Sequence, residues 1–273
     1  MSLSKKIMRK FLLGSFKLKI RALMTGNFKS FTGYKEALKS CKSNGYEDSD
    51  LVSSVVRKTE LSLDSLNVNQ ILTDVESLRI HHLLENNFKS PATVLDFGGG
   101  AGIQFFKNYI IDTNHLIKKW IVVETPKMAK TAIRLKNKKL NFTSDFSDAG
   151  KIDFFFANSS IQYCDNLEEI LLEVLSRKPK FIYLCRTPFN LRSNKIISTQ
   201  RSLLSKNGPR VNNLKEKDTV VEYPIIFYPY EHIHSLLSKS YEIIFKQNLS
   251  QSAFMHLRGE ISTLDLVYKQ LGK

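Results

Sequence analysis

The chain has 273 residues, an apolar fraction of 42% and a net charge of +15. This length and composition indicate a globular protein with one large core and room for a small added subdomain. The sequence contains no run of about 18 apolar residues, which excludes a transmembrane helix. Three cysteines without a Cys-x-x-Cys pair argue against a disulfide scaffold or a zinc ribbon and fit a reducing cytosol, so we expect a cytoplasmic protein.

The N-terminal segment 1–30 is a basic arm. It contains eight Lys or Arg residues and no acid, and residues 5–24 can form a helix with the apolar side chains near one side. Basic amphipathic helices of this kind lie on anionic membrane surfaces, so we expect peripheral contact with the inner face of a membrane. The alternative is a solvated, partly disordered tail that docks loosely on the domain.

Residues 31–91 are predicted to form a helical cap. One helix starts at Tyr34, a second runs from Asp48 to Val56, and a third runs from Asp74 to Glu85. Because these helices precede the first predicted strand, we expect them to lie over the ligand-binding edge of the sheet.

Strands and helices alternate from about residue 92, which is the signature of an open parallel sheet. The predicted strands are 93–97, 119–124, 140–144, 152–157 and 180–185, and the predicted helices between them are 102–112, 126–138 and 166–176. A further helix near 230–239 and two strands near 241–247 and 261–268 complete this second domain, 92–273.

The most informative stretch is the Val-Leu-Asp-Phe-Gly-Gly-Gly-Ala-Gly sequence at 94–102. An apolar strand here enters a turn with four glycines, and glycine allows the backbone to approach a nucleotide-like ligand closely. A second apolar strand ends in Glu124, at the spacing that places an acid on a ribose hydroxyl. The two segments together predict a cofactor site.

The turn does not suit a dinucleotide. The third glycine of the dinucleotide pattern is replaced by Ile103, and a carboxylate at Asp96 would repel a pyrophosphate. The same carboxylate suits the ammonium and sulfonium of S-adenosylmethionine (SAM). The pattern resembles the class I SAM-dependent methyltransferases, which implies a Rossmann-like seven-stranded α/β sheet closed by an antiparallel hairpin. The alternative is an ordinary strand-to-helix turn without a ligand.

Ligands bind at the carboxyl ends of the strands in such sheets, so the residues that follow each strand are site candidates. For the cofactor we expect Asp96 and the turn to hold the methionine part, Glu124 the ribose and Asp145 with Phe146 the adenine. For the acceptor we expect Gln162, Tyr163 and Arg186. The full set of predicted cofactor residues is Asp96, Phe97, Gly98, Gly99, Gly100, Gly102, Glu124, Asp145, Phe146 and Asn158.

A more specific resemblance covers about residues 30–270. Phe-Thr-Gly-Tyr at 31–34, the glycine turn, Val-Glu-Thr-Pro at 123–126, Ser-Ser-Ile-Gln-Tyr at 159–163 and Arg-Thr-Pro at 186–188 resemble a family of bacterial methyltransferases. Members of that family tend to occur in loci for surface-polysaccharide (O-antigen or capsule) biosynthesis. The resemblance implies SAM as cofactor and a glycan or small-molecule acceptor. Lys35 stands where the family usually has a Trp, so the cap is expected to differ.

Transfer to a hydroxyl also needs a base, and the candidates are Tyr163 and His232. His232 and His234 lie near the basic segment in sequence, where they could cover the pocket. A His-x-His pair is too few ligands for a metal site, so no metal is predicted.

The second basic segment is the predicted insertion 189–217, which holds seven Lys or Arg residues and one acid. Its charge would suit a phosphorylated or acidic acceptor such as a nucleotide-linked or lipid-linked sugar; the alternative is a solvated, mobile loop. The function predicted from the sequence is therefore O-methylation of a sugar. Its alternatives are an RNA methyltransferase and a non-catalytic SAM-fold protein that binds a membrane or a partner. Nucleic acid is not expected, because no RNA-binding module is present.

Overall fold

The computed structural model describes residues 26, 29–43, 45–211, 214, 219–249 and 259–272. The predicted membrane-binding helix at 5–24 lies outside these residues. Across the described ranges, none of the helices combines the length and the apolar character needed to cross a membrane.

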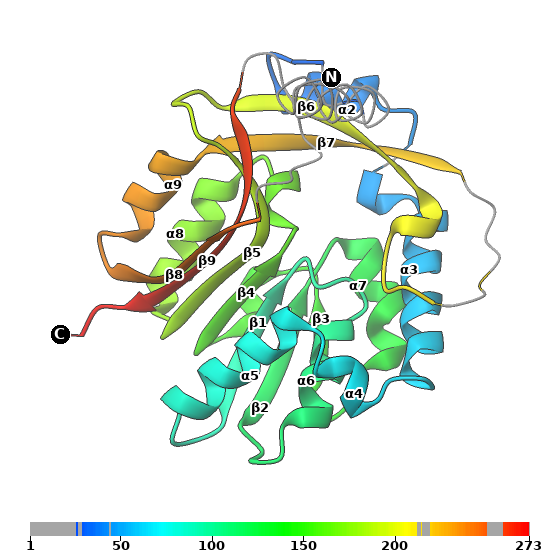
Figure 1. Cartoon of the computed structure of the whole chain (residues 1–273). Helices are drawn as coiled ribbons and strands as arrows, with labels where there is room; N and C mark the ends of the chain where they lie inside the picture. Colours follow the sequence, from blue (N-terminus) through cyan, green and yellow to red (C-terminus); the bar gives the residue numbers. More distant parts are fainter. Residues whose placement is uncertain are drawn as a thin grey trace, which may run out of the picture.

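The core of the fold is a sheet whose first five strands are parallel, in the order β3-β2-β1-β4-β5 (Figure 1). Their bounds are β1 Ala92–Phe97, β2 Ile117–Val123, β3 Leu140–Thr143, β4 Phe154–Asn158 and β5 Phe181–Asn190. The central strands β1 and β4 are buried almost throughout, as expected for parallel strands covered on both faces. The predicted strands are thus confirmed, and their carboxyl ends meet at one edge.

Two antiparallel strands close the sheet beside β5. Strand β9 (Ile261–Gln270) pairs with β5, and β8 (Tyr241–Asn248) pairs with β9. The seven strands therefore follow the order β3-β2-β1-β4-β5-β9-β8, with β9 reversed. This is the predicted Rossmann-like arrangement with its closing hairpin, and the predicted fold class is confirmed.

The structure adds two strands that the sequence analysis treats as part of a basic loop. Strand β6 (Ile196–Leu203) pairs antiparallel with β7 (Val220–Pro229), and β7 joins the sheet through Phe189 and Asn190 of β5. The mobile-loop alternative for 189–217 is therefore wrong for residues 196–203. Figure 1 shows this hairpin running across the top of the molecule, with α2 (Tyr34–Ser40) beside it.

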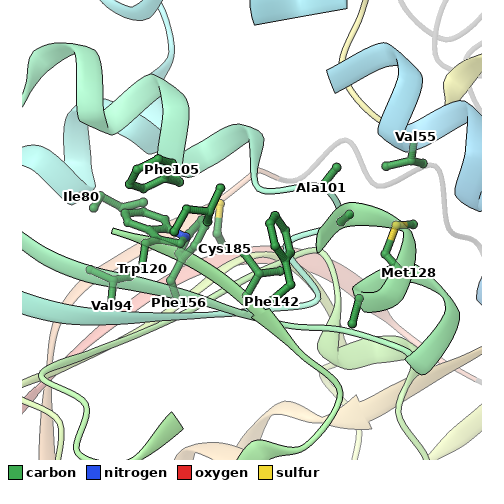
Figure 2. Close-up of a cluster of buried hydrophobic side chains, with 14 of the residues drawn as sticks. Val55, Ile80, Val94, Ala101, Phe105, Trp120, Met128, Phe142, Phe156 and Cys185 are labelled. Carbon is green, nitrogen blue, oxygen red and sulfur yellow. The ribbon is translucent and has the colours of Figure 1, made fainter. Parts of the chain in front are cut away.

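The period-two alternation of strand side chains divides the core between the two faces of the sheet. One face packs against α3 (Ser49–Leu63), α5 (Val75–Asn87), α6 (Ile103–Ile111) and α7 (Pro126–Ala132). Figure 2 shows Ile80, Phe105 and Trp120 together in this cluster. The opposite face packs against α8 (Leu167–Arg177) and α9 (Tyr230–Leu237). Helices on both faces make the sheet doubly wound.

The predicted N-terminal helices form, but they pack on different partners. α2 contacts the β6–β7 hairpin, α3 contacts α7, and α5 contacts α6. Asp48 and Asp74 cap α3 and α5, because their carboxylates accept backbone N–H groups of the first turn. The short α4 (Val68–Ile71) links the two. The division into a cap, 31–91, and a second domain stays a prediction.

Candidate functional site

The glycine turn between β1 and α6 has a backbone that other residues could not adopt. Gly98, Gly100 and Gly102 have φ angles of +69°, +61° and +78°, in the left-handed region. A Cβ on Gly98 would also lie closer than 3.0 Å to the Cβ of Ser160. The Ser160 hydroxyl in turn donates to the Phe97 carbonyl over 2.5 Å, which holds the β4 loop against the turn. The glycines are therefore required for the close approach of two strand ends.

Most of the turn's N–H groups are used inside the chain. The N–H of Gly98 donates to the Val123 carbonyl, that of Gly100 to the Glu124 carboxylate, and that of Gly102 to the Gly99 carbonyl. A pyrophosphate bound at a glycine-rich turn relies on free N–H groups at this position. The N–H groups of these three glycines are therefore not free to bind a phosphate.

Asp96 lies beneath the turn rather than on its surface. Its carboxylate is fully buried, and a side chain on Gly99 would collide with it. Oδ2 accepts a hydrogen bond from Trp120 Nε1 over 3.0 Å, whereas Oδ1 has no partner among the described residues. Burial raises the pKa of Asp96 to about 7, and the charge of Glu124 adds to this rise. Asp96 therefore lies behind Gly99 and also belongs to the lining of the first cavity.

Glu124 stands at the end of β2, where the sequence analysis expects an acid. Oε1 accepts from the Gly100 N–H over 2.8 Å, and Oε2 accepts from the Thr125 N–H over 2.9 Å. Burial raises the pKa of this carboxyl, and the two N–H donors oppose the rise. A carboxylate has about four acceptor positions, so Glu124 keeps free lone pairs for a ligand's hydroxyl groups.

Two cavities meet at this edge of the sheet. The first has a volume of about 1600 Å³ and is lined by Asp96, the glycine turn, α3 and the segment 200–211. The second has a volume of about 820 Å³ and is lined by the ends of β1, β2 and β3 and by the start of α8. Gly98, Glu124 and Tyr163 line both cavities, so a single ligand lying across them would pass Glu124.

The second cavity suits a flat apolar ring. Phe97 and Phe146 line it with Val123, and the centroids of the two phenyl rings lie 6.4 Å apart. Asp145, which we expect on the adenine, is exposed and instead accepts the Ser147 N–H as the cap of a short 3₁₀ turn. That hydrogen bond lowers the pKa of Asp145. Of the predicted adenine pair, Phe146 lines the cavity, and Asp145 is not among its lining residues.

Asn158 and Arg186 lie together at the floor of the first cavity. Arg186 Nε donates to Asn158 Oδ1 over 2.9 Å and lies 3.4 Å from Glu76 Oε1 of α5. Arg186 has a φ of +47°, and its backbone N–H donates to Asp265 Oδ1 over 2.7 Å. β9 therefore fixes the left-handed residue that turns the guanidinium toward the cavity.

The remaining candidates lie in three different places. Tyr163 lines both cavities, and its hydroxyl donates to Gln200 Oε1 over 3.0 Å. Gln162 is buried with its amide donating to the Ser159 hydroxyl, and it does not line either cavity. Gly102 starts α6 and packs on Leu140 rather than facing a cavity.

His232 is far from the expected position over the pocket. It lies on α9 with half of its side chain exposed, and its Nε2 is 3.0 Å from Glu168 Oε1 of α8. His234 of the same helix contacts Tyr268. The expected position of His232 over the pocket is not seen, because this residue lines neither cavity. Within the described ranges, no group of three or more His, Cys, Asp or Glu residues is arranged to hold a metal ion.

Two tyrosines that the sequence did not indicate as site residues, Tyr46 and Tyr223, lie with the predicted Tyr163 where the two cavities meet. Tyr46, Tyr163 and Tyr223 pack together with ring centroids 4.6 to 5.2 Å apart, and all three line both cavities. Tyr223 belongs to β7, which the sequence analysis did not foresee. Burial raises the pKa of Tyr163 well above its ordinary value, so its phenol is neutral near pH 7.

The chain matches no protein-family model and no curated protein. Among solved structures, it is similar to a SAM-dependent methyltransferase from Clostridium acetobutylicum, at 16% identity and a TM-score of 0.45, over 71% of this chain and 89% of that one. It is also similar to the 1,6-didemethyltoxoflavin-N1-methyltransferase of Burkholderia thailandensis, at 12% identity and a TM-score of 0.46, over 90% of this chain and 94% of that one. A third similar structure is the N-terminal domain of EvdMO1, at 12% identity and a TM-score of 0.47, over 72% of this chain and 84% of that one.

Identities this low say nothing of this chain's ligand or reaction, and TM-scores below 0.5 add no support to the fold. The strand order and the reversed β9 carry that conclusion instead. The chain has a doubly wound, Rossmann-like α/β fold with an added β6–β7 hairpin.

Proposed function

We propose that the protein is a SAM-dependent methyltransferase. The observation that carries the proposal is the position of Glu124, which lies where the two cavities meet and is fixed by the Gly100 N–H. In this arrangement the adenine would lie between Phe97 and Phe146, and the ribose hydroxyls would donate to Glu124. The methionine part would follow Gly98 to Gly100 into the first cavity.

The electrostatics of the turn favour a cation over a diphosphate. Asp96 and Glu124 place two carboxyl groups at the sheet edge, and Asp96 Oδ1 is buried without a partner among the described residues. A positive charge near the turn would favour the ionised form of Asp96 without touching it, because the intervening medium is of low dielectric. The N–H groups of Gly98, Gly100 and Gly102 already donate to acceptors of the chain and are not free for a phosphate.

The acceptor we propose is a hydroxyl of a sugar in a surface glycan or its precursor. Bound SAM supplies a methyl group activated by its cationic sulfur. The first cavity supplies hydrogen-bonding side chains next to aromatic faces, since Asn158, Arg186 and Gln200 line it with the tyrosines. Positioning of the acceptor by these groups would provide much of the acceleration. The family resemblance noted in the sequence supports the same class of acceptor.

The proton of the acceptor hydroxyl requires a base in the same cavity. Tyr163 is a neutral phenol and already donates to Gln200, and His232 lies elsewhere. Glu76 lines the first cavity beside Arg186 and Asn158, and its side chain is mostly buried. We therefore propose Glu76 as the general base.

Calorimetry with SAM and with S-adenosylhomocysteine tests the cofactor. We expect micromolar binding to the wild type and a loss of about 100-fold in Glu124→Ala, because the ribose then loses its acceptor. Glu168→Ala is the matched control, since Glu168 is an exposed acid on α8. Tight binding of NADH in place of SAM, or equal SAM affinity in Glu124→Ala, would contradict the proposal.

The second candidate function is methylation of RNA, which the net charge of +15 favours. A filter-binding assay with bulk RNA separates the two, because RNA binding depends steeply on salt. Retention of RNA above 200 mM salt together with methyl incorporation into it would favour this alternative.

A further inference from the structure

The carboxyl groups that line the first cavity belong to other segments than the cations at 201–210. Asp74 pairs with Lys107 over 2.6 Å, and Glu76 pairs with Arg186 at 3.4 Å. The other lining carboxyl groups, Asp96 and Glu124, lie at the sheet edge.

The cations of the opposite wall are Arg201, Lys206 and Arg210. Arg201 pairs with Glu222 over 2.8 Å. Lys206 and Arg210 are exposed, and no acid of the described residues lies within 4.0 Å of either. Lys206 and Arg210 therefore add two positive charges to the cavity lining that have no acidic partner among the described residues.

The segment that carries these two cations is held in place by a buried lysine. Lys58 of α3 is 3% exposed, and its ammonium donates to the carbonyls of Ser205 and Asn207 over 2.6 and 2.8 Å. Asn207 also donates to the Ser202 hydroxyl, and Gly208 packs against Val55 of α3. Lys206 and Arg210 thus stand on an anchored segment at the rim of the cavity.

Aliphatic side chains also contribute to the lining of this cavity, next to polar ones such as Ser65 and Gln70. Leu61 and Val220 line the cavity and are 40% and 49% exposed, and Leu66 and Val211 line it as well. Exposed Val68 and Leu72 lie on and directly after α4. Exposed aliphatic side chains that gather at a cavity mouth usually mark a binding surface. Charge and apolar surface meet here at one opening.

We propose that this rim binds an isoprenyl-type lipid phosphate, so that the acceptor is a sugar linked through phosphate to a lipid. The inference rests on the proposed function and narrows its acceptor. Lys206 and Arg210 would pair with the phosphate oxygens, and Leu61, Leu66, Val211 and Val220 would cover the first part of the lipid chain. The sugar would then extend toward Asn158 and Arg186. A nucleotide-linked sugar would put a polar base against these aliphatic side chains, which favours the lipid.

The test uses the full-length protein with saturating S-adenosylhomocysteine and three probes: farnesyl diphosphate, inorganic pyrophosphate and uridine diphosphate. Calorimetry is expected to show farnesyl diphosphate binding at least tenfold more tightly than the other two. Equal affinities of farnesyl diphosphate and pyrophosphate would overturn the role of the apolar rim. Tighter binding of uridine diphosphate would assign the cavity to a nucleotide-linked sugar and overturn the proposal.

Variants separate the two parts of the site. Lys206→Ala/Arg210→Ala is expected to weaken farnesyl diphosphate and pyrophosphate by tenfold or more, whereas Leu61→Ser/Val220→Thr is expected to weaken farnesyl diphosphate alone. Lys239→Ala and Leu172→Ser, which change an exposed cation and an exposed apolar residue elsewhere, are the matched controls. Equal effects in the controls would overturn the site.

Two further measurements keep the outcomes distinct. The affinity for S-adenosylhomocysteine should be unchanged within twofold in all these variants. If the wild type does not bind S-adenosylhomocysteine, the proposed function is refuted. If the wild type binds S-adenosylhomocysteine but not farnesyl diphosphate, only this inference is refuted. Binding to phosphatidylglycerol vesicles that requires Lys206 and Arg210, and that farnesyl diphosphate does not displace, would assign the rim to membrane attachment and overturn the inference.

Discussion

The indole N–H of Trp120 donates to Asp96 Oδ2 over 3.0 Å and so joins β2 to β1 beneath the glycine turn. Both residues are fully buried. The indole is the only donor to this carboxylate among the described residues, since Oδ1 has none. The state of Asp96 therefore depends on one neighbouring side chain.

Trp120→Phe removes that donor and keeps an aromatic ring in the core. We expect a loss of about 2 kcal/mol in the free energy of unfolding above pH 8, where Asp96 is ionised, because a hydrogen bond to a charged group contributes about 1.5–3 kcal/mol. Urea denaturation measures this loss. Trp120→Phe should cost less stability in an Asp96→Asn background than in the wild type. If the losses of the two single variants simply add in the double variant, the hydrogen bond contributes little.

Asp96 gives the stability a definite pH dependence. Its pKa is about 7 in the folded chain and 3.8 ordinarily, so the folded state holds the proton more tightly than the unfolded state. The stabilisation this confers is complete below about pH 4 and is lost as the pH rises through 7, an effect of about 4 kcal/mol at most. Asp96→Asn should therefore flatten the pH profile of unfolding between about pH 4 and 7. A profile identical to that of the wild type would contradict the assigned pKa.

The same group should couple cofactor binding to pH. A cationic ligand favours ionised Asp96, so SAM affinity should rise about tenfold between pH 5.5 and 7, with proton release near pH 6.5. Calorimetry in two buffers of different ionisation enthalpy counts the released protons. Asp96→Asn should abolish the release; unchanged release in that variant would place the titration on another group.

Gly98→Ala and Gly100→Ala form a matched pair in the turn. Both positions have positive φ, which costs an alanine about 1–2 kcal/mol. Only at Gly98 would the new Cβ collide with Ser160, whereas at Gly100 it meets Val55 at an ordinary 3.4 Å. We expect Gly98→Ala to lose at least 1 kcal/mol more than Gly100→Ala in thermal or urea unfolding. Equal losses would show that the Ser160 loop yields.

Lys58→Met tests the anchor of the segment 204–208. The carbonyls of Ser205 and Asn207 lose the hydrogen bonds that the Lys58 ammonium donates, so we expect a loss of about 2 kcal/mol in stability, since a hydrogen bond to a charged group contributes about 1.5–3 kcal/mol. SAM binding should be unchanged, because Lys58 is remote from Glu124 in the hydrogen-bond network. Lys130→Met, at an exposed lysine of α7, is the control. An equal loss of stability in this control would contradict the anchoring of the segment 204–208 by Lys58.

The parallel strands could be predicted because Val, Ile and Phe runs such as 154–156 are buried on both sides and recur between helical segments. The capped starts at Asp48 and Asp74 predicted α3 and α5 equally well. β6 could not be predicted, because Ile-Ile-Ser-Thr-Gln-Arg has weak alternation and its partner, β7, begins only after a 16-residue connection, 204–219, rather than a tight turn.

Site residues at the ends of strands could be predicted from the sequence, whereas those placed by the packing of distant elements could not. Glu124 and the glycine turn lie at strand ends, which meet at one edge by topology. The depth of Asp96 depends on Trp120 from another strand, and the direction of His232 depends on how α9 packs against α8. Tyr223 reaches the site only through the unforeseen hairpin.

β7 is joined to the sheet through just two residues of β5, Phe189 and Asn190, although it supplies Tyr223 and one wall of the first cavity. Backbone pairing of β7 with β5 is thus short among the described residues, and the side chains of Val221, Tyr223, Ile226 and Tyr228 hold the hairpin by packing into the two core clusters. On the proposed function, substitutions in the segment 200–211 would reshape the acceptor side of the first cavity while Glu124 and the glycine turn keep their positions.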